Sequence, residues 1–294
     1  MGQTMDRHKG DNLQEHENYT EFDSPQEHGN RPEPDNLVEL EDVYMYKEET
    51  PVLNGVTTGF PGGSTSVIVG ASGCGKSTLL KTSAFLYPPD SGHVFYKKRD
   101  IGKMGEKELL AMRAASGFMF QDGALWANKN LWDNLALPVE LHRPELSTQE
   151  VGNLIRSLVK TFTFTGNLQN RPAAFSAGKQ KIISFMRAVI LGPSLLFLDE
   201  PTTFIDRRSS SIIINQLKLY HQQACTIVMV SHDPEIIGLI GDYLYVMKEG
   251  RLLASGLLDD VLNHPDPEVQ AEVEEISRLS RPYRQKNENI ALKP

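Results

Sequence analysis

Three short runs of apolar residues divide the middle of the chain, and each has the length of a strand rather than of a helix. They occupy 65–69, 195–198 and 226–230 and are dominated by Val, Ile, Leu and Met. Strands that are apolar without alternation are typical of a parallel sheet that is covered on both faces. The runs therefore predict the buried strands of an α/β domain.

Other patterns predict the elements around these strands. Further strands are indicated at 37–44, 52–60, 93–96 and 117–120, with a closing hairpin at 243–247 and 251–256. Apolar residues at helical spacing indicate helices at 107–115, 150–165, 182–191 and 267–279. We expect a mixed sheet core with an antiparallel β edge and, at about 122–190, a helical subdomain.

The first 36 residues differ from the rest in composition. They hold few large apolar side chains, and nine acidic against three basic residues give them −6 of the net charge of −8. Such a segment cannot offset the entropy lost on ordering. We expect 1–36 to be a disordered acidic tail, either simply solvated or with a regulatory or docking role. Residues 37–262 would form the main domain, and 263–294 would add an amphipathic helix and a tail.

The composition also excludes several classes of function. The part after the tail is nearly neutral, so it lacks the basic face with which proteins bind nucleic acid. Two cysteines cannot build a disulfide framework, which favours a reducing, cytosolic compartment. No apolar run is long enough to span a bilayer, and the N-terminus lacks the apolar core of a signal peptide. We expect any role at a membrane to be peripheral and to depend on partners.

The residues after the first buried run match the phosphate-loop pattern G-x-x-x-x-G-K-[ST]: Gly70, Ala71, Ser72, Gly73, Cys74, Gly75, Lys76, Ser77 and Thr78. They lie between a predicted strand and a predicted helix, as the motif requires. The glycines let backbone N–H groups turn inward around an anion, and the helix start adds its dipole. Lys76 would reach the β and γ phosphates, and the Ser77 hydroxyl would bind Mg²⁺. The sequence therefore predicts a nucleotide site.

Polar side chains follow the other two buried runs. Asp199 and Glu200 come directly after the second run, and His232 follows the third. In open α/β sheets ligands bind at the carboxyl ends of the strands, so these side chains should lie beside the phosphate loop. Asp199 would hold Mg²⁺, Glu200 would act as general base on the attacking water, and His232 would face the γ-phosphate.

Two groups of aromatic residues have alternative interpretations. Tyr44 and Tyr46 precede the first turn, where an exposed tyrosine would stack on an adenine base or else pack within the sheet, and the stacking role fits Tyr46 better. Trp126 and Trp132 are the only tryptophans. They would form either the core of the helical subdomain or a docking surface, because aromatic residues are frequent in interfaces.

From 37 to 256, the chain resembles the ATP-binding subunits of ABC transporters. The phosphate loop, Gln121, the loop at 176–181, the strand ending in Asp199 and Glu200, Asp206 and His232 occur in that family's order and spacing. The resemblance implies a P-loop ATPase fold of ABC type, with ATP and Mg²⁺ as cofactors. It also implies that Gln121 senses Mg²⁺ and the membrane partner, and that His232 contacts the γ-phosphate.

The resemblance further implies a head-to-tail dimer, expected to be a homodimer, in which Ser176, Gly178 and Asp206 act across the interface on the partner's ATP. Two stretches depart from the family pattern. The signature loop reads Phe-Ser-Ala-Gly-Lys instead of Leu-Ser-Gly-Gly-Gln, and the aspartate loop reads Thr-Phe-Ile-Asp instead of Ser-Gly-Leu-Asp. We still expect ATP hydrolysis, at a reduced rate.

A finer resemblance involves 120–138 and 263–269, which are similar to the ATPases of Mla and Mce lipid transport systems. It implies a subunit on the cytoplasmic face of the inner membrane that powers a lipid-moving permease, with a small accessory subunit docked on the C-terminal extension. The alternatives are an ATPase for import of a small solute, a weakly hydrolysing regulatory subunit, and a soluble ABC protein of translation or DNA repair. A single phosphate loop and the lack of sustained heptads count against the last of these.

Overall fold

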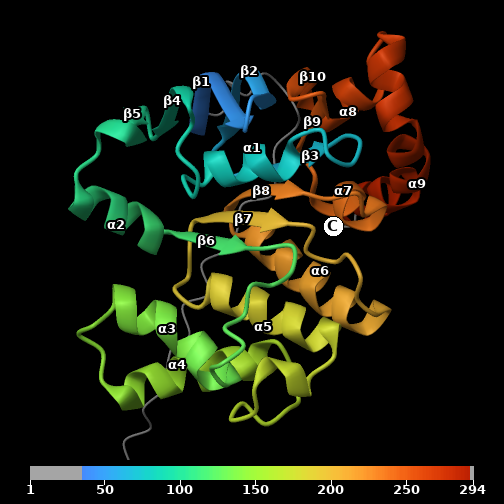
Figure 1. The fold of residues 1–294 in the computed structure, drawn as a ribbon. Helices are drawn as coiled ribbons and strands as arrows, with labels where there is room; N and C mark the ends of the chain where they lie inside the picture. The colour runs from blue at the N-terminus through green and yellow to red at the C-terminus, as the bar shows by residue number, and fades with distance from the viewer. Residues whose placement is uncertain (1–34, 292–294) are drawn as a thin grey trace, which may run out of the picture. The chain divides into compact units, whose positions relative to one another are not determined.

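The computed structural model describes residues 35–291. In it the buried runs lie side by side in a six-stranded sheet with the strand order β10-β9-β3-β8-β7-β6 (Figure 1). Its strands are β3 (Thr65–Val69), β6 (Ser116–Met119), β7 (Leu195–Asp199), β8 (Thr226–Val230), β9 (Tyr243–Lys248) and β10 (Arg251–Leu257). Every residue of β3, β7 and β8 is buried. All neighbouring strands are parallel except β10 on β9, which supplies the expected antiparallel edge.

A second, antiparallel sheet has the order β2-β1-β4-β5. It consists of β1 (Asn36–Lys47), β2 (Thr50–Pro61), β4 (Ser91–Tyr96) and β5 (Arg99–Asp100). Between the two sheets lies α1 (Lys76–Ser83), which begins in the phosphate loop (Figure 1). Leu79 and Leu80 of α1 are fully buried against apolar side chains of both sheets. This packing fixes the helix that carries the loop residues.

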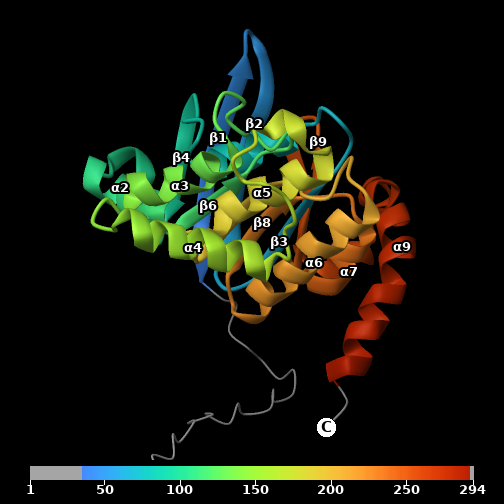
Figure 2. The ribbon, with the colours of Figure 1, turned by 90° about the horizontal axis from the view of Figure 1, so that it is seen from below.

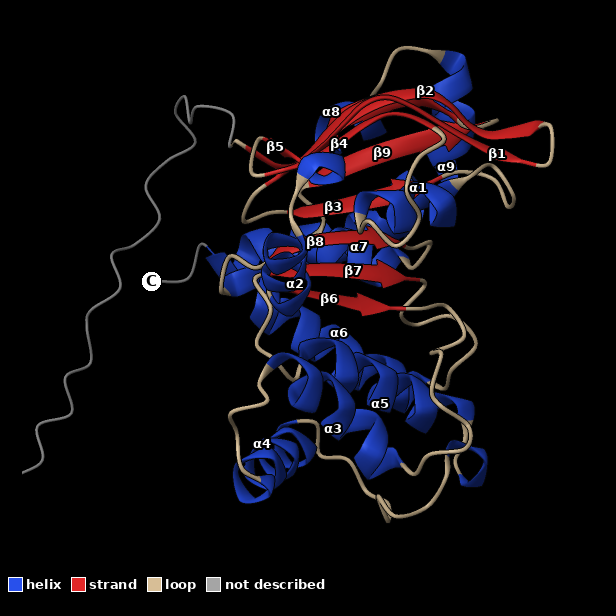
Figure 3. Cartoon of the chain, turned by 60° about the vertical axis from the view of Figure 1, so that its left-hand side comes forward, coloured by secondary structure: helices blue, strands red, loops and turns tan. Residues whose placement is uncertain are grey.

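Helices cover the opposite face of the central sheet and form a group at its β6 side. The group contains α3 (Leu131–His142), α4 (Thr148–Thr161) and α5 (Ala177–Val189), which Figure 3 shows beyond β6. The other helices of this face are α6 (Arg207–Gln222), α7 (Pro234–Ile240), α8 (Leu258–Leu262) and α9 (Pro267–Ala291). Helix α2 (Glu106–Ala114) instead packs in the cluster that contains α1, and short 3-10 turns lie at Ile101–Lys103 and Pro172–Ala174. Local sequence signals set the starts of some helices. At the start of α4, for example, Ser147 and Glu150 form a capping box.

Several helix ends differ from the sequence prediction. The helix expected to begin at Ile182 begins at Ala177, because the Ser176 hydroxyl accepts a hydrogen bond from the Lys179 N–H and caps it. The helix expected at 150–165 ends at Thr161, since Thr163 adopts a left-handed φ of 45°. The C-terminal helix extends past 279 and packs beside α7 (Figure 2). Helices α3, α6, α7 and α8 were not among the predicted helices.

The predicted acidic tail lies outside the described residues, apart from Asp35 and from Asn36, where β1 begins. Within residues 35–291, no helix combines the length and the apolar character needed to cross a bilayer. The C-terminal extension is held to the domain at Gly238 of α7, where an added Cβ would contact Ser280 and Tyr283 of α9. Val269 and Val273 of α9 are buried, as their helical spacing predicted.

Candidate functional site

The phosphate loop depends on glycines at three positions. Gly70, Gly73 and Gly75 have φ values of 138°, 80° and 106°, which other residues adopt only with strain. An added Cβ on Gly70 would collide with the Met247 carbonyl, and one on Gly75 would lie 2.6 Å from the Val52 carbonyl. Gly73 has no neighbour within 4 Å of that position. Two glycines are therefore required by packing, whereas Gly73 faces the open side of the loop.

Lys76 is nearly buried at the centre of the loop, with 8% of its surface exposed. Its ammonium donates to the Gly70 carbonyl (2.7 Å) and to the Ala71 carbonyl (2.8 Å). The same loop contains Cys74, and burial raises the pKa of its thiol against the opposing effect of Lys76. The loop thus presents one fixed positive charge beside the start of α1, an arrangement that favours a bound anion.

The two strongest candidates for Mg²⁺ ligands are in direct contact. The Ser77 hydroxyl donates to Oδ1 of Asp199 at 2.9 Å, and Asp199 is 1% exposed at the end of β7. Hydroxyl and carboxylate oxygens are the donors that Mg²⁺ prefers, so these residues fit the ion. Within residues 35–291, no group of three or more His, Cys, Asp or Glu residues could hold a metal by itself. Phosphate oxygens and water would complete the coordination, with Gln121 as the further predicted ligand.

Glu200 follows Asp199 and is held from several sides. Its N–H donates to the Val230 carbonyl of β8 (2.9 Å), and its carboxylate Oε2 accepts from the Thr203 hydroxyl (2.7 Å). His232 Nε2 lies 3.8 Å from Oε1 of the same carboxylate. Partial burial lowers the pKa of His232, while Glu200 acts in the opposite direction. Burial therefore favours the neutral imidazole, which can accept or donate a hydrogen bond at the site.

These residues surround one cavity of about 430 Å³. It is lined by Val52, Ser72, Gly73, Gly75, Lys76, Ser77, Thr78, Gln121, Glu200, Thr203, Phe204, Val230 and His232. The structure thus brings the phosphate loop together with Gln121, Glu200 and His232, from four different segments of the chain. Gly70, Ala71, Cys74 and Asp199 lie in or against the same loop, behind the residues that line the cavity.

The predicted residues Ser176, Gly178 and Asp206 are absent from the lining of this cavity, and Gly178 lies against Asp206. An added Cβ on Gly178 would lie 2.6 Å from the Asp206 carboxylate and would also collide with the Ser209 hydroxyl. Asp206 caps α6 by accepting from the N–H and the hydroxyl of Ser209, and these bonds lower the pKa of Asp206. The close approach falls on Gly178, whereas Ala177 is exposed. The altered residue Ala177 therefore leaves this contact intact.

Tyr46 does not line the cavity. It is 48% exposed on β1, and its N–H donates to Oδ2 of Asp90. Tyr46 pairs with Pro51 in the β1–β2 hairpin, next to Val52, which does line the cavity. Stacking of Tyr46 on adenine stays a prediction.

Sequence reasoning missed three residues around Glu200. Thr203 and Phe204 line the cavity, and the Lys181 ammonium donates to the Glu200 carbonyl at 2.7 Å. The position of Thr203, three residues after Glu200 in the turn that follows the strand, was the available signal. Phe204 and Lys181 had no local signal, since their placement depends on the tertiary fold.

The comparisons with known proteins decide the family. A family model described as ABC transporter matches residues 53–203, about half of the chain. The chain belongs to the ABC transporter family. This confirms the predicted fold class and the resemblance to ABC ATP-binding subunits. ABC ATPases bind and hydrolyse ATP, and they work as dimers with membrane permease partners.

Two curated relatives represent different transport systems. The chain is 29% identical over 239 residues to the intermembrane phospholipid transport ATP-binding protein MlaF of Haemophilus influenzae, covering 80% of this chain and 89% of that protein. It is 32% identical over 235 residues to the methionine import ATP-binding protein MetN of Mesorhizobium japonicum, covering 79% of this chain. The match spans only 64% of that MetN protein's length.

Solved structures agree with the fold. The ATP-binding cassette MJ0796, a dimer in a post-hydrolysis state bound to ADP and Pi, has a TM-score of 0.69 and 28% identity. That similarity covers 75% of this chain and 98% of the cassette. The unmatched quarter of this chain is therefore additional to a complete ATP-binding cassette.

We predict that Gly73→Ala and Gly75→Ala both weaken ATP binding, because each places a Cβ in the phosphate loop. Only Gly75→Ala should strongly destabilise the domain, since its Cβ also presses on the Val52 carbonyl, adding about 1–3 kcal/mol of overpacking to the left-handed strain. Urea unfolding and titration with a fluorescent ATP analogue measure the two effects separately. Equal stability of the two variants would contradict the packing assigned to Gly75.

Proposed function

We propose that this chain is the ATP-hydrolysing subunit of a membrane transporter and that it uses the residues around the 430 Å³ cavity. The observation that carries the proposal is the placement of Glu200, since its carboxylate contacts Thr203 and His232 at the edge of the phosphate-loop cavity. A nucleotide-binding protein without hydrolysis has no need for a carboxylate held at that edge. The arrangement favours hydrolysis over binding alone.

Each residue has a defined task in this proposal. Lys76 and the loop N–H groups bind the β and γ phosphates, and Ser77 and Asp199 would hold Mg²⁺. Mg²⁺, when bound, neutralises charge on the phosphate oxygens. Glu200 orients the attacking water and accepts its proton, and His232 contacts the γ-phosphate. In phosphoryl transfer most of the catalysis comes from such positioning and charge stabilisation.

Substitutions at two positions test this assignment. Lys76→Ala should abolish ATP binding or hydrolysis, because it removes the phosphate-binding charge. Glu200→Gln should keep ATP binding and lower turnover by at least about 100-fold, since the amide cannot accept a proton. Steady-state ATPase and equilibrium binding of labelled ATP are the measurements. Undiminished turnover in Glu200→Gln would show that Glu200 is not the general base. ATP binding without turnover in the wild type would favour the regulatory alternative.

The proposal includes a head-to-tail homodimer in which the Ser176 loop of one copy contacts the ATP of the other. Two features support it. Gly178, two residues after Ser176, lies against Asp206, and none of the three residues lines its own chain's cavity, so a second copy is needed to bring them to a nucleotide. Phe204 at the cavity rim is 86% exposed, which is unusual for a phenylalanine unless a partner covers it.

We predict that Ser176→Arg weakens ATP-dependent dimerisation while leaving ATP binding by the monomer nearly intact. The substitution is made in the Glu200→Gln protein, so that bound ATP persists during sedimentation. Ser157→Arg, at an exposed position of α4, is the matched control and should dimerise like the parent. A Ser176→Arg dimer as stable as the control would contradict the shared site.

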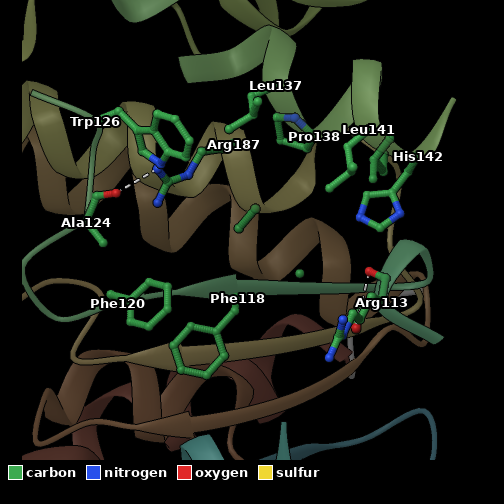
Figure 4. A pocket seen from close by; sticks show the side chains of 14 residues that line it. Arg113, Phe118, Phe120, Ala124, Trp126, Leu137, Pro138, Leu141, His142 and Arg187 are labelled. Carbon is green, nitrogen blue, oxygen red and sulfur yellow. Dashed lines mark hydrogen bonds between the residues drawn. The ribbon is translucent and has the colours of Figure 1, made fainter. Parts of the chain in front are cut away.

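A groove beside the helical group is the proposed contact for the permease. It has a volume of about 390 Å³ and contains apolar side chains from β6, α3 and the segment after Gln121, among them Phe118, Trp126, Leu137, Pro138 and Leu141 (Figure 4). Trp126 is 50% exposed, whereas Trp132 packs against the core. Asn134 fixes the Trp126 backbone by accepting from its N–H and donating to its carbonyl. Trp126 therefore presents a half-exposed aromatic side chain from a fixed backbone, and such residues anchor interfaces.

The proposed cargo is lipid, and the proposed location is the cytoplasmic face of the inner membrane. The similarity to MlaF over most of that protein's length supports a lipid transporter. The C-terminal extension would then carry a small accessory subunit, on the α9 surface that does not pack on α7 and α8. The similarity to MetN supports the alternative, import of a small polar solute. Since the two relatives are about equally identical to this chain, identity alone does not separate them.

We predict that Trp126→Ala uncouples ATP hydrolysis from transport or weakens assembly with the permease. It should cost far less stability than the ~3–5 kcal/mol of a buried tryptophan, because half of the side chain is already exposed. Leu219→Ala, a similarly exposed residue of α6, is the control and should leave assembly unchanged. Normal coupling in the Trp126 variant would exclude this groove as the permease contact.

The cargo is tested on the assembled complex purified in mild detergent. Mass spectrometry should identify a bound lipid beyond the annular background if the lipid proposal is right. A complex that carries only a small polar solute, together with a solute receptor, would replace the lipid proposal with the importer alternative.

A further inference from the structure

Lys181 is a buried lysine that the assigned mechanism does not use. It lies in the first half of α5 with 7% of its surface exposed, and its ammonium donates to the backbone carbonyl of Glu200 at 2.7 Å. Moving an ammonium out of water is costly unless it is paired and hydrogen-bonded. A methionine of similar length would fill the same space at lower cost. The charge therefore has to be explained by what it contacts.

The surroundings of Lys181 are acidic on two sides. Asp199 and Glu200 face it from the end of β7, and Asp122 faces it from the segment after Gln121. Burial lowers the pKa of Lys181, and these three carboxylates act to raise it. The ammonium thus lies between the predicted Mg²⁺ ligand, the predicted base and the segment after Gln121.

Glu200 needs support of this kind because its backbone is strained. Its φ of 49° is in the left-handed region, which a non-glycine residue adopts only when its surroundings impose it. The N–H is held by Val230 of β8, and the carbonyl is held by Lys181 of α5. Thr203 then fixes the carboxylate. The direction of the carboxylate is set by these contacts together.

We propose that Lys181 is a positioning residue that holds the Glu200 backbone, so that the carboxylate points at the attacking water. This inference rests on the proposed hydrolytic function of Glu200. Lys181 lies five residues after Ser176 on the same helix. It therefore also links the loop that faces the partner's ATP to the base of its own chain. A shift of α5 on dimerisation would be transmitted to Glu200 through this contact.

Three substitutions separate the two properties of the side chain. Lys181→Arg keeps both charge and donor, Lys181→Gln keeps a donor without charge, and Lys181→Met keeps only the apolar stem. We expect kcat to fall about 10- to 100-fold in Lys181→Met, because small displacements of a catalytic group cost factors of this size. KM for ATP should stay near the wild-type value, and Lys181→Arg should recover most of the rate. The rate in Lys181→Gln should lie between those of the other two variants.

Controls distinguish this role from a merely structural one. Lys160→Met removes an exposed lysine of α4 and should behave as the wild type. Urea unfolding identifies any variant that fails to fold. If Lys181→Met fails, the kcat values of Lys181→Gln and Lys181→Arg are compared instead. The inference is overturned if folded Lys181→Met keeps the wild-type kcat. It is also overturned if kcat falls equally in all three Lys181 variants. A wild type that binds ATP without hydrolysing it overturns the proposed function, and the inference with it.

Discussion

The site depends on the alignment of three parallel strands, β3, β7 and β8. Their pairing brings the carboxyl ends of all three to one edge of the sheet, so the phosphate loop, Asp199 and the segment before His232 meet there. Two hydrogen bonds mark the result: Ser77 donates to Asp199 between the first two segments, and Glu200 donates to Val230 between the last two. A slip of one residue in either pairing would turn these side chains to opposite faces.

The parts predicted from sequence were those with strong local signals. The phosphate loop has fixed spacing, and the buried runs have no alternation, so both could be placed without knowing the fold. Helix α6 was missed because its first half contains three serines, 209–211, followed by the β-branched residues 212–214, and these residue types have low helix propensity. Tertiary packing overrides that propensity, with Ile213 fully buried, and the Asp206 cap fixes the start. Lys181 is a further case, because no local pattern separates a buried lysine from one on a solvated helix face.

The departures from the family pattern differ in their structural effect. At the signature loop, the steric requirement for a missing Cβ falls on Gly178, which this chain has, while Ala177 is exposed. At the aspartate loop, Phe204 replaces the small residue of the family pattern and adopts a left-handed φ of 62°. A phenylalanine in that conformation stores strain that glycine would not. The second departure therefore alters the molecule more than the first, and it does so at the cavity rim.

Helix α5 connects the regions whose changes must be coordinated if hydrolysis is to drive a partner. Its cap, Ser176, does not line its own chain's cavity, and Lys181 contacts Glu200. Further along the same helix, the Ser184 hydroxyl donates to the Gly123 carbonyl, and the Arg187 guanidinium donates to the carbonyls of Gly123 and Ala124. Those carbonyls belong to the segment that leads from Gln121 to Trp126. Because side chains three residues apart lie on neighbouring parts of a helix face, one rigid element contacts the catalytic edge and the exposed groove together. Displacement of α5 as a unit cannot change one of these contacts without changing the other, which is the physical basis for coupling between them.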